Sequence, residues 1–347
     1  MRKRRAWWPL LVGLSVIALA VGLIIWRGPD WGSVRSAFNA VSWSWVAAAI
    51  GLNLLSVLTR SVAWDAAIEQ SIEPPHPAYP LVFSAFSVGL FANAVLPGRV
   101  GELARVAVLR RRMVGRKGTT ATLVGSVFAH RMFDLFPTIA LVVWVLFAAK
   151  IPGWAYTSLG LALTVGLVLF TVAVILARRQ HREVDELGPI RLVLARARQG
   201  LAVMRRPLPA FKAGTFQFLG WTCQLLAVWS TMQAFQIHLP LAAAGLVLVL
   251  MNVATIFPVW PGNVGLVQIA VATPLVNYGV DYAHGIAFGI GLQAIEASVG
   301  IGIGLVFLAR EGLSYATLKQ MEEAEEEREV EERPERERER AGTGVAG

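Results

Sequence analysis

Apolar runs of bilayer length, separated by short polar segments, fill most of the chain up to about residue 310. A helix needs about 20 apolar residues to cross a hydrocarbon core of ~30 Å. This pattern predicts an all-α polytopic membrane protein. The runs fall near residues 8–26, 43–63, 80–96, 120–149, 154–177, 214–237, 240–257, 264–279 and 285–309.

Basic clusters restrict how these runs cross the membrane. Arginine and lysine gather at 2–5, 110–117 and 178–212, and such residues concentrate in cytoplasmic loops. The clusters share one side only if 80–109 and 240–279 enter the membrane and return to the face they came from. We therefore expect about six full transmembrane helices, both termini in the cytoplasm, and two re-entrant hairpins of opposite orientation, as in an inverted repeat. The full spans are expected at 8–26, 43–63, 120–149, 154–177, 214–237 and 285–309.

The two expected hairpins share a motif. Residues 96–101 read Leu-Pro-Gly-Arg-Val-Gly, and residues 260–265 read Trp-Pro-Gly-Asn-Val-Gly. Broken backbone at membrane depth is tolerated only where protein or a water-filled cavity covers its free N–H and C=O groups. Paired breaks in two halves therefore predict a binding site where the halves meet. The residues expected to form the breaks are Pro97, Gly98, Gly101, Pro261, Gly262 and Gly265.

Composition agrees with a membrane protein and limits the alternatives. Of the 347 residues, 55% are hydrophobic and 16% are charged, a mixture too apolar for a soluble domain. The net charge of +9 is spread over loops between apolar runs, so it indicates membrane orientation and argues against a nucleic-acid partner. The one cysteine, Cys223, excludes an intramolecular disulfide and a cysteine-based metal cluster. We expect no metal and no other cofactor.

The charge pattern also predicts the domain organisation. Residues 1–310 are expected to form an integral membrane domain. Residues 311–347 are expected to form a charged cytoplasmic tail, helical or disordered, because 321–340 is almost only glutamate and arginine. Within the membrane domain, 178–212 is expected to be either an amphipathic helix at the inner leaflet or a solvated linker helix.

Three charged residues follow the first break at i,i+3 spacing, namely Arg99, Glu102 and Arg105. Glu102 is expected to neutralise one arginine, which leaves the other beside a helix N-terminus that favours an anion. A lipid phosphate is the obvious anion in this setting, because an arginine can bind it bidentately. The structural alternative is that the arginines extend toward cytoplasmic water, which suits Arg105 better than Arg99.

A second charged group lies near the middle of the expected span 120–149. Asp134 is four residues from His130 and three from Arg131, so it can pair with either one on the same helix face. Charges at the bilayer centre are candidates for function, and a self-neutralised structural pair is the alternative.

Polar residues near the second break carry no charge, and Asn263 and Gln268 are as suited to joining helices as to binding a ligand. Glu296, with Gln293, lies in the last expected span. It should either pair with an arginine or be protonated, and a protonating carboxyl could couple transport to protons. The candidate partners are Arg60, Arg99 and Arg131. Close helix packing is predicted by the small-xxx-small spacing of Gly285, Gly289, Gly300 and Gly304.

The segment from Asn93 to Arg105, followed by Arg131-Met132-Phe133-Asp134 and by Pro261 to Gly265, resembles the lysylphosphatidylglycerol synthase transmembrane, or flippase-like, family. The resemblance covers most of residues 8–310. Long members of that family join this membrane domain to a cytosolic aminoacyl-transferring domain and move the aminoacylated lipid to the outer leaflet. The resemblance therefore implies a stand-alone membrane domain that translocates a lipid. Family members tend to carry a second glycine and a glutamate where this chain has Asn263 and Gln268.

We therefore expect a plasma-membrane lipid translocator that moves a phosphate-bearing lipid, a phospholipid or a polyprenyl phosphate, between leaflets. Two alternatives stay open: a membrane-embedded transferase or accessory protein acting on a lipid-phosphate-linked sugar, and a non-catalytic scaffold. No P-loop, zinc-protease or nucleophile-elbow motif occurs, so no catalytic residue is expected. A homo-oligomer, or a protein partner at the tail, is compatible with each. The expected substrate-binding residues are Arg99, Glu102, Arg105, Arg131, Asp134, Asn263, Gln268 and Glu296.

Overall fold

Every regular element described in the structure is helical, as the hydrophobic pattern predicts. The computed structural model describes residues 29–96, 100–113, 119–151, 153, 156–157, 160–161, 163–168, 171, 203, 206–255 and 263–312. Its helices are α2 (Trp31–Asn39), α3 (Trp43–Ser71), α4 (Tyr79–Val95), α5 (Gly101–Arg112), α6 (Thr119–Ala148), α9 (Pro207–Ala234), α10 (Leu241–Ala254), α11 (Leu266–Val276) and α12 (Tyr282–Arg310). The expected span 8–26, most of 154–177 and most of 178–212 lie outside the described residues.

Three of these helices are long and apolar enough to cross a membrane, namely α3, α6 and α12. A stretch of 29 residues in each spans about 43 Å at 1.5 Å per residue, which exceeds a core of ~30 Å. They match the expected spans 43–63, 120–149 and 285–309. The expected span 214–237 corresponds to α9, which is 28 residues long because it begins earlier, with a proline in its first turn.

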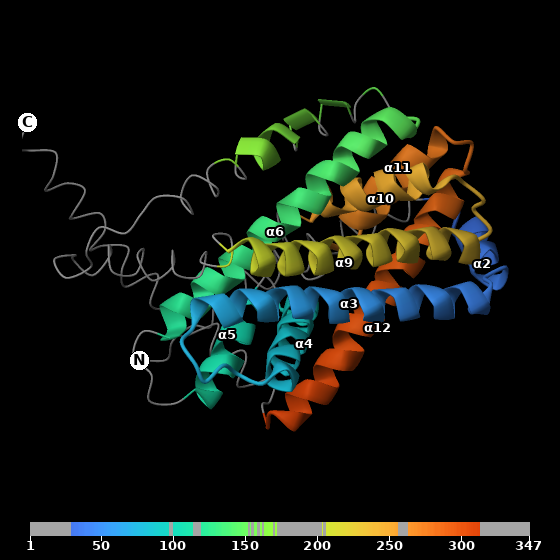
Figure 1. Cartoon of the computed structure of the whole chain (residues 1–347). Helices are drawn as coiled ribbons and strands as arrows, with labels where there is room; N and C mark the ends of the chain where they lie inside the picture. Colours follow the sequence, from blue (N-terminus) through green and yellow to red (C-terminus); the bar gives the residue numbers. More distant parts are fainter. Residues whose placement is uncertain are drawn as a thin grey trace, which may run out of the picture.

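The helices α3 and α9 run antiparallel, side by side (Figure 1). At one end the Ser42 N–H donates to the Ala234 carbonyl over 2.9 Å. At the other end the Lys212 ammonium lies 3.6 Å from the Glu69 carboxylate. Between them the Ser56 hydroxyl donates to the Gly220 carbonyl over 2.8 Å, where the missing side chain of Gly220 lets the backbones approach.

Two pairs of short helices interrupt this framework. In the first pair α4 has 17 residues and α5 has 12; in the second, α10 has 14 and α11 has 11. The apolar members α4, α10 and α11 reach about 26, 21 and 17 Å, less than the hydrocarbon core. Both predicted motifs fall between the helices of a pair. Residues 97–99 and 256–262, which include Pro97, Gly98, Pro261 and Gly262, lie outside the described residues.

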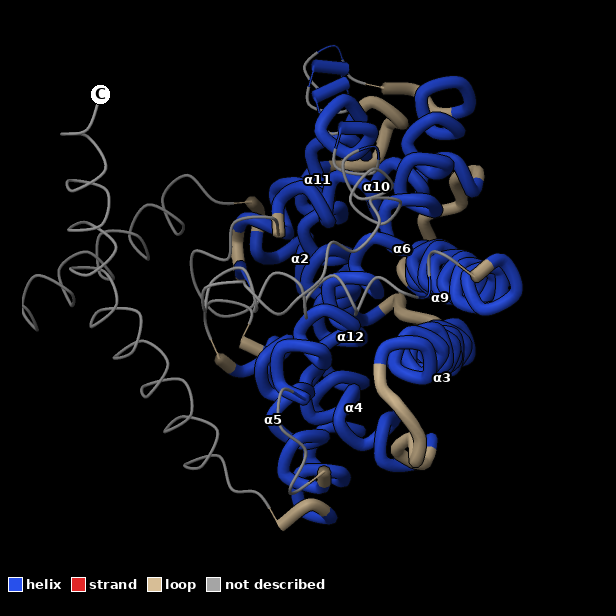
Figure 2. Tube along the Cα trace, turned by 60° about the vertical axis from the view of Figure 1, so that its left-hand side comes forward, coloured by secondary structure: helices blue, strands red, loops and turns tan. Residues whose placement is uncertain are grey.

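The helix α12 lies between the two pairs and packs against both (Figure 2). Its first two glycines face α11, since a Cβ on Gly285 would meet Ala272 and a Cβ on Gly289 would meet Gln268. Its later glycines face α4, where Gly300 adjoins Ala94 and Gly304 adjoins Phe91. The expected packing role of these four glycines is therefore confirmed.

The order of these contacts shows that both pairs point at the middle of α12. Ser84, near the start of α4, donates to Glu311 over 2.8 Å, whereas Ala94, near its end, adjoins Gly300. In the second pair Ala272 adjoins Gly285, and Gln268, nearer the break, adjoins Gly289. The two breaks thus approach α12 from opposite ends. Gln293 and Glu296 lie on α12 between them, within about 16 Å of helix.

The described loops sort into two ends of the molecule. The basic end, which we define by Arg110, Arg111, Arg112, Lys212 and Arg310, includes a 3.1 Å ion pair between Arg112 and Glu311. At the opposite end the Lys150 N–H donates to the Tyr278 hydroxyl over 2.7 Å, and the His284 ring donates to the Phe235 carbonyl over 2.6 Å. The helix α4 begins and α5 ends at the basic end, whereas α10 begins and α11 ends at the opposite end.

One helix was not predicted from the apolar runs. α2 has only nine residues, capped by the Asp30 carboxylate, which accepts from the Gly32 N–H over 2.9 Å. It buries only Val34 and Ala37, against a core cluster shared with α9, α10, α11 and α12. So short an amphipathic segment carries too few apolar residues to stand out in a search for bilayer-length runs.

The tightest contact between α4 and α5 gives a test of this packing. A Cβ added to Gly101 would overlap the Gly89 carbonyl oxygen and the Asn93 side chain. We expect Gly101→Ala to destabilise the protein by about 1–3 kcal/mol, because packed helices must separate to admit the methyl group. The measurement is the free energy of unfolding in detergent, followed by circular dichroism.

Gly51→Ala is the matched control, since a Cβ on Gly51 meets nothing within 4 Å. That change should raise stability by about 0.5–1 kcal/mol, because alanine loses less conformational freedom in a helix. Equal unfolding of the two variants would contradict the close approach of α4 and α5.

Candidate functional site

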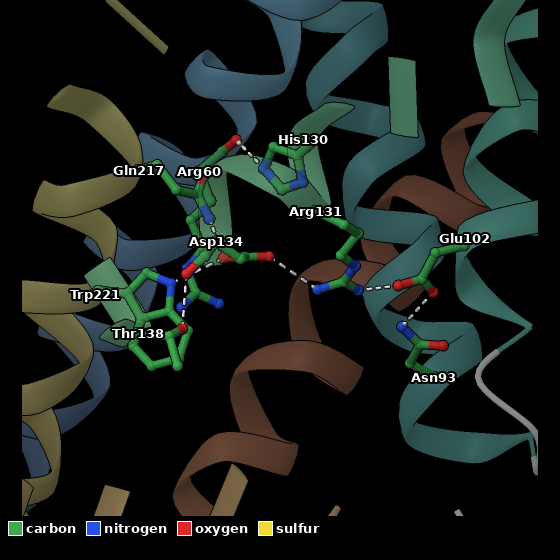
Figure 3. A network of polar contacts seen from close by, with 9 residues as sticks. All are labelled: Arg60, Asn93, Glu102, His130, Arg131, Asp134, Thr138, Gln217 and Trp221. Atoms are coloured by element: carbon green, nitrogen blue, oxygen red, sulfur yellow. Dashed lines mark hydrogen bonds and ion pairs between the residues drawn. The ribbon is translucent and has the colours of Figure 1, made fainter. Parts of the chain in front are cut away.

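A chain of polar side chains joins four helices near the first break (Figure 3). It begins at Gln217 and Trp221 of α9, passes through Asp134 and Arg131 of α6, and continues to Glu102 of α5 and Asn93 of α4. On α9 the two members are four positions apart, and on α6 they are three positions apart, so each pair shares one face of its helix. This series of polar contacts connects the long helices α6 and α9 with the interrupted pair α4 and α5.

Asp134 accepts hydrogen bonds from three side chains. The Trp221 indole donates over 2.8 Å and the Arg131 guanidinium over 3.2 Å, and the Gln217 amide donates to the same oxygen as Trp221. The Asp134 side chain is only 14% exposed. A buried carboxylate is stable only when its lone pairs are engaged, and these three donors meet that requirement. The expected pairing of Asp134 with Arg131 is the one formed.

Arg131 bridges two carboxylates, because it also forms an ion pair with Glu102. The other Glu102 oxygen accepts from the side-chain NH₂ of Asn93 over 3.2 Å, and the side-chain oxygen of Asn93 accepts from the Gly101 N–H over 2.8 Å. Asn93 therefore satisfies the first backbone N–H of α5. The spacing on α5 favoured Arg99 or Arg105 as the partner of Glu102, and among the described residues its partner is instead Arg131 of the neighbouring helix.

His130 takes no part in the Asp134 pair. Its Nε2 atom lies 3.1 Å from the Arg60 carbonyl oxygen, which can only accept, so Nε2 carries the proton. In the neutral ring Nδ1 is then an acceptor. It is buried and has no hydrogen-bond partner within the described part of the chain.

Arg105 is buried rather than extended toward water, because only 4% of it is exposed. Its guanidinium carbon lies 4.7 Å from the Trp64 ring centre and 5.6 Å from that of Phe86. Its Nε and Nη2 atoms find no acceptor among the described residues. Stacking contributes about 0.5–2 kcal/mol, whereas an unsatisfied buried donor costs about 1–3 kcal/mol and more when charged. Stacking alone therefore does not offset the burial of this cation.

Arg60 is a second cation of this kind. Its guanidinium carbon lies 5.0 Å from the Trp221 ring centre, and its buried Nε atom has no acceptor among the described residues. Sequence reasoning considered Arg60 only as a partner for Glu296. A signal for a larger role was present, since Arg60 is the one charged residue in the apolar run 43–63.

Glu296 lies close enough to Arg60 for an electrostatic interaction, but the pair is not among the ion pairs within 4 Å that the described residues form. The Gln224 amide donates to the Glu296 carboxylate over 3.3 Å. Of the two proposed partners that the structure describes, Arg60 and Arg131, Arg60 is the one that acts on it.

The polar residues of the second break form a separate group. Gln268 accepts from the Gly265 N–H at the start of α11 and donates to the Gln293 side chain of α12. Gly265 has φ +92° and Asn263 has φ +47°, so the chain turns sharply before α11. Asn263 is buried, with 3% exposed. In this arrangement Gln268 caps one helix and joins it to another.

Some of the expected site cannot be placed. Arg99, Pro97, Gly98, Pro261 and Gly262 lie outside the described residues. Among the residues that the structure does describe, no group of three or more His, Cys, Asp or Glu side chains could hold a metal ion. The described site is thus one of paired charges, two stacked arginines and amide groups.

Comparison with known families agrees with the resemblance found in the sequence. The family model described as Lysylphosphatidylglycerol synthase TM region matches residues 10–304. No curated protein and no solved structure matches the chain.

The three donors on Asp134 lead to a stability prediction. Asp134→Asn should destabilise the protein by about 1–3 kcal/mol, because the asparagine amide turns an NH₂ group toward donors that then lack an acceptor. Adding Arg131→Gln should not restore stability, because Glu102 would then lose its own partner. Thermal unfolding of the purified variants in detergent measures both effects.

Asp281→Asn is the matched control. Asp281 caps α12 by accepting from the Ala283 and His284 N–H groups, and asparagine caps a helix about as well as aspartate. If Asp134→Asn unfolds no earlier than Asp281→Asn, the Asp134 carboxylate is not needed to hold α6 and α9 together.

Proposed function

Because the chain belongs to the lysylphosphatidylglycerol synthase TM region family, we propose that it translocates a phosphate-bearing lipid between the leaflets of the plasma membrane. The family relates the chain to membrane lipids in general. The specific activity, movement of a lipid between leaflets, is what we propose. The observation that carries it is the series of polar contacts that runs from Asp134 through Arg131 and Glu102 to Asn93. Charged groups in a membrane interior are costly, and they are retained mainly where a polar substrate or ion must pass.

The proposal includes the membrane topology. We place the basic end in the cytoplasm, with about six full spans, both termini on that side, and two re-entrant hairpins of opposite orientation. Two observations support it: each short-helix pair returns to the end where it began, and the two breaks approach the middle of α12 from opposite ends. Residues 1–310 then form the membrane domain, and the tail begins near Glu311, whose side chain is still bound by Arg112.

The lipid headgroup and acyl chains need different surroundings. We propose that the headgroup moves along the polar chain and that Arg99, beside the first break, binds its phosphate. For an acyl chain the outer side of the α6–α9 pair offers an apolar groove of about 600 Å³. Its lining includes Phe133 and Phe136 of α6 and Phe211 and Phe218 of α9. The same two helices thus carry the polar chain on one side and the groove on another.

Two of the described carboxylates, Asp134 and Glu102, favour translocation over group transfer. A transferase needs a carboxylate free to act as a base. Asp134 is held by three donors, and Glu102 is held by Arg131 and Asn93. Both are therefore better suited to fix the positions of helices and arginines than to exchange protons with a substrate.

Single cysteines introduced into a Cys223→Ser background test the topology. Lys117 follows α5 in the sequence, in the basic cluster 110–117, and His238 lies in the exposed loop before α10. We expect a membrane-impermeant maleimide to label His238→Cys in intact cells, and to label Lys117→Cys only after lysis. Labelling of Lys117→Cys from outside would show that the first helix pair crosses the membrane.

Reconstituted vesicles test the transport activity. Fluorescent phospholipids and polyprenyl phosphates are followed from leaflet to leaflet with purified protein. We expect Arg99→Met to lower the transport rate at least about tenfold, because a hydrogen-bonded charge on the phosphate is lost. Arg111→Met, at the exposed end of α5, is the matched control and should transport at the wild-type rate. Normal transport by the Arg99 variant would remove that arginine from the path.

A further inference from the structure

The helix α3 links the two stacked arginines. Arg60 and Trp64 are four residues apart on α3, so they lie on one face about 6 Å apart along the axis. Arg60 stacks on Trp221 of α9, while Trp64 receives Arg105 of α5. One helix thus contributes the cation to the first arginine–tryptophan pair and the aromatic ring to the second. The Arg60 guanidinium thus lies over a ring of α9, whereas the Arg105 guanidinium lies over rings of α3 and α4.

Of the three arginines, the exposed one is paired and the two buried ones are not. Arginines that only stabilise the fold would show the reverse. Arg131, which is 44% exposed, has two carboxylate partners. Arg60 and Arg105 form no ion pair with any described residue, although they carry buried nitrogen atoms without acceptors. Buried charged groups are normally paired. The two unpaired guanidinium groups are therefore prepared for an acceptor that does not belong to the described chain.

Asp134 lies within electrostatic reach of both arginines. It cannot pair fully with either, because Arg131, Gln217 and Trp221 already occupy its oxygens. His130 likewise lies within electrostatic reach of both arginines, and its Nε2 atom is 3.1 Å from the Arg60 carbonyl oxygen. Asp134 reduces the repulsion between two buried cations and still leaves their N–H groups available to a ligand.

The N–H groups of Arg60 and Arg105 that lack an acceptor, rather than an excess of charge, favour an anion. Three arginines, Arg60, Arg105 and Arg131, stand against three carboxylates, Asp134, Glu102 and Glu296, so the formal charges of this described group cancel. The ion pairs within 4 Å nevertheless involve only Arg131, Asp134 and Glu102, and two guanidinium groups keep buried nitrogen atoms without acceptors. The aromatic faces fix the guanidinium planes, so the N–H edges present the fork that binds two oxygens of a phosphate.

We propose that Arg60 and Arg105 are two successive stations for the phosphate of a lipid, with Asp134 and His130 within electrostatic reach of both. The assignment rests on the proposed translocation and adds where the phosphate stops. In this structure Arg60 is partly exposed, whereas Arg105 is 4% exposed. The phosphate reaches Arg60 first in this conformation and reaches Arg105 when α5 moves relative to α3.

Two alternative binding positions and one joint binding site predict different affinities for single-arginine variants. A single phosphate with two alternative positions keeps most of its affinity when one position is removed, because the other still binds it. Transport needs both positions, so it stops when either is lost. If both arginines instead gripped one phosphate together, each single change would weaken binding at least about tenfold.

The experiment measures binding and transport on the same variants. Dioctanoyl phosphatidic acid is titrated by calorimetry into the purified full chain in nanodiscs, with dioctanoylglycerol and inorganic phosphate as separate titrants. The variants are Arg60→Gln, Arg105→Gln and their combination. Arg310→Gln is the matched control, because Arg310 also lies over an aromatic ring, 5.9 Å from the centre of Phe307, but is exposed at the end of α12.

We expect each single variant to bind phosphatidic acid within about threefold of wild type and the double variant to bind at least about tenfold more weakly. Both single variants should lose at least about tenfold in transport rate. Arg310→Gln should match wild type in both assays. Dioctanoylglycerol, which lacks the phosphate, should not bind, and inorganic phosphate should bind more weakly than the lipid.

Several results would overturn the proposal. Loss of binding in one single variant alone would leave one station, and loss in each would indicate a joint clamp. Normal binding by the double variant would remove both arginines from the site. Equal binding of inorganic phosphate would make it a site for free phosphate. These outcomes leave the proposed function intact if wild type still moves lipid, whereas a wild-type protein that moves none in vesicles refutes that function itself.

Arg60→Lys and Arg105→Lys cover the case in which a glutamine variant does not fold. Lysine keeps the charge but loses the planar fork. Each folded lysine variant should bind within about threefold of wild type, and the double lysine variant should bind more tightly than double glutamine. A folded double lysine variant that moves lipid at the wild-type rate would show that the fork is not needed, contrary to the proposal.

Discussion

The interior of a bilayer contains no water to solvate a charge or a free backbone N–H, and the described site follows from that constraint. Each polar group introduced there must be satisfied by another group of the protein or by a bound ligand. Asp134 therefore collects three donors, and Arg131 lies between two carboxylates. The same rule explains Asn93, whose amide satisfies both the Gly101 N–H and the Glu102 carboxylate. The first break is thereby tied to α6 and, through Asp134, to α9.

The same constraint gives α12 its central place. Helix pairs that end within the membrane need another helix to cover their ends. α12 supplies that cover for both pairs through glycines that let backbones approach, Gly285 and Gly289 for α11 and Gly304 for α4. The ends of α4 and α11 that adjoin the breaks thus pack on the same helix, Ala94 beside Gly300 and Gln268 beside Gly289.

Sequence reasoning succeeded where the pattern belongs to one helix. The spacing of glycines on α12, the Arg131–Asp134 pair and the interruption of both short-helix pairs are all local patterns, and the structure has each of them. It failed where the partner comes from another helix. The spacing on α5 could not reveal that Glu102 binds Arg131 or that Arg105 stacks on Trp64. The search for bilayer-length apolar runs could not reveal the short helix α2. Spacing defines which residues share a face, and tertiary packing decides what that face meets.

The two halves of the molecule are alike in backbone and unlike in chemistry. At the first break the helix start is bonded by Asn93, which in turn holds Glu102 and so connects to the charges on α6. At the second break the helix start is bonded by Gln268, which holds the uncharged Gln293. A uniformly charged pair of breaks would bind an anion at both and release it slowly. Among the described residues, the charged side chains instead gather beside the start of α5, whereas neutral amides hold the start of α11.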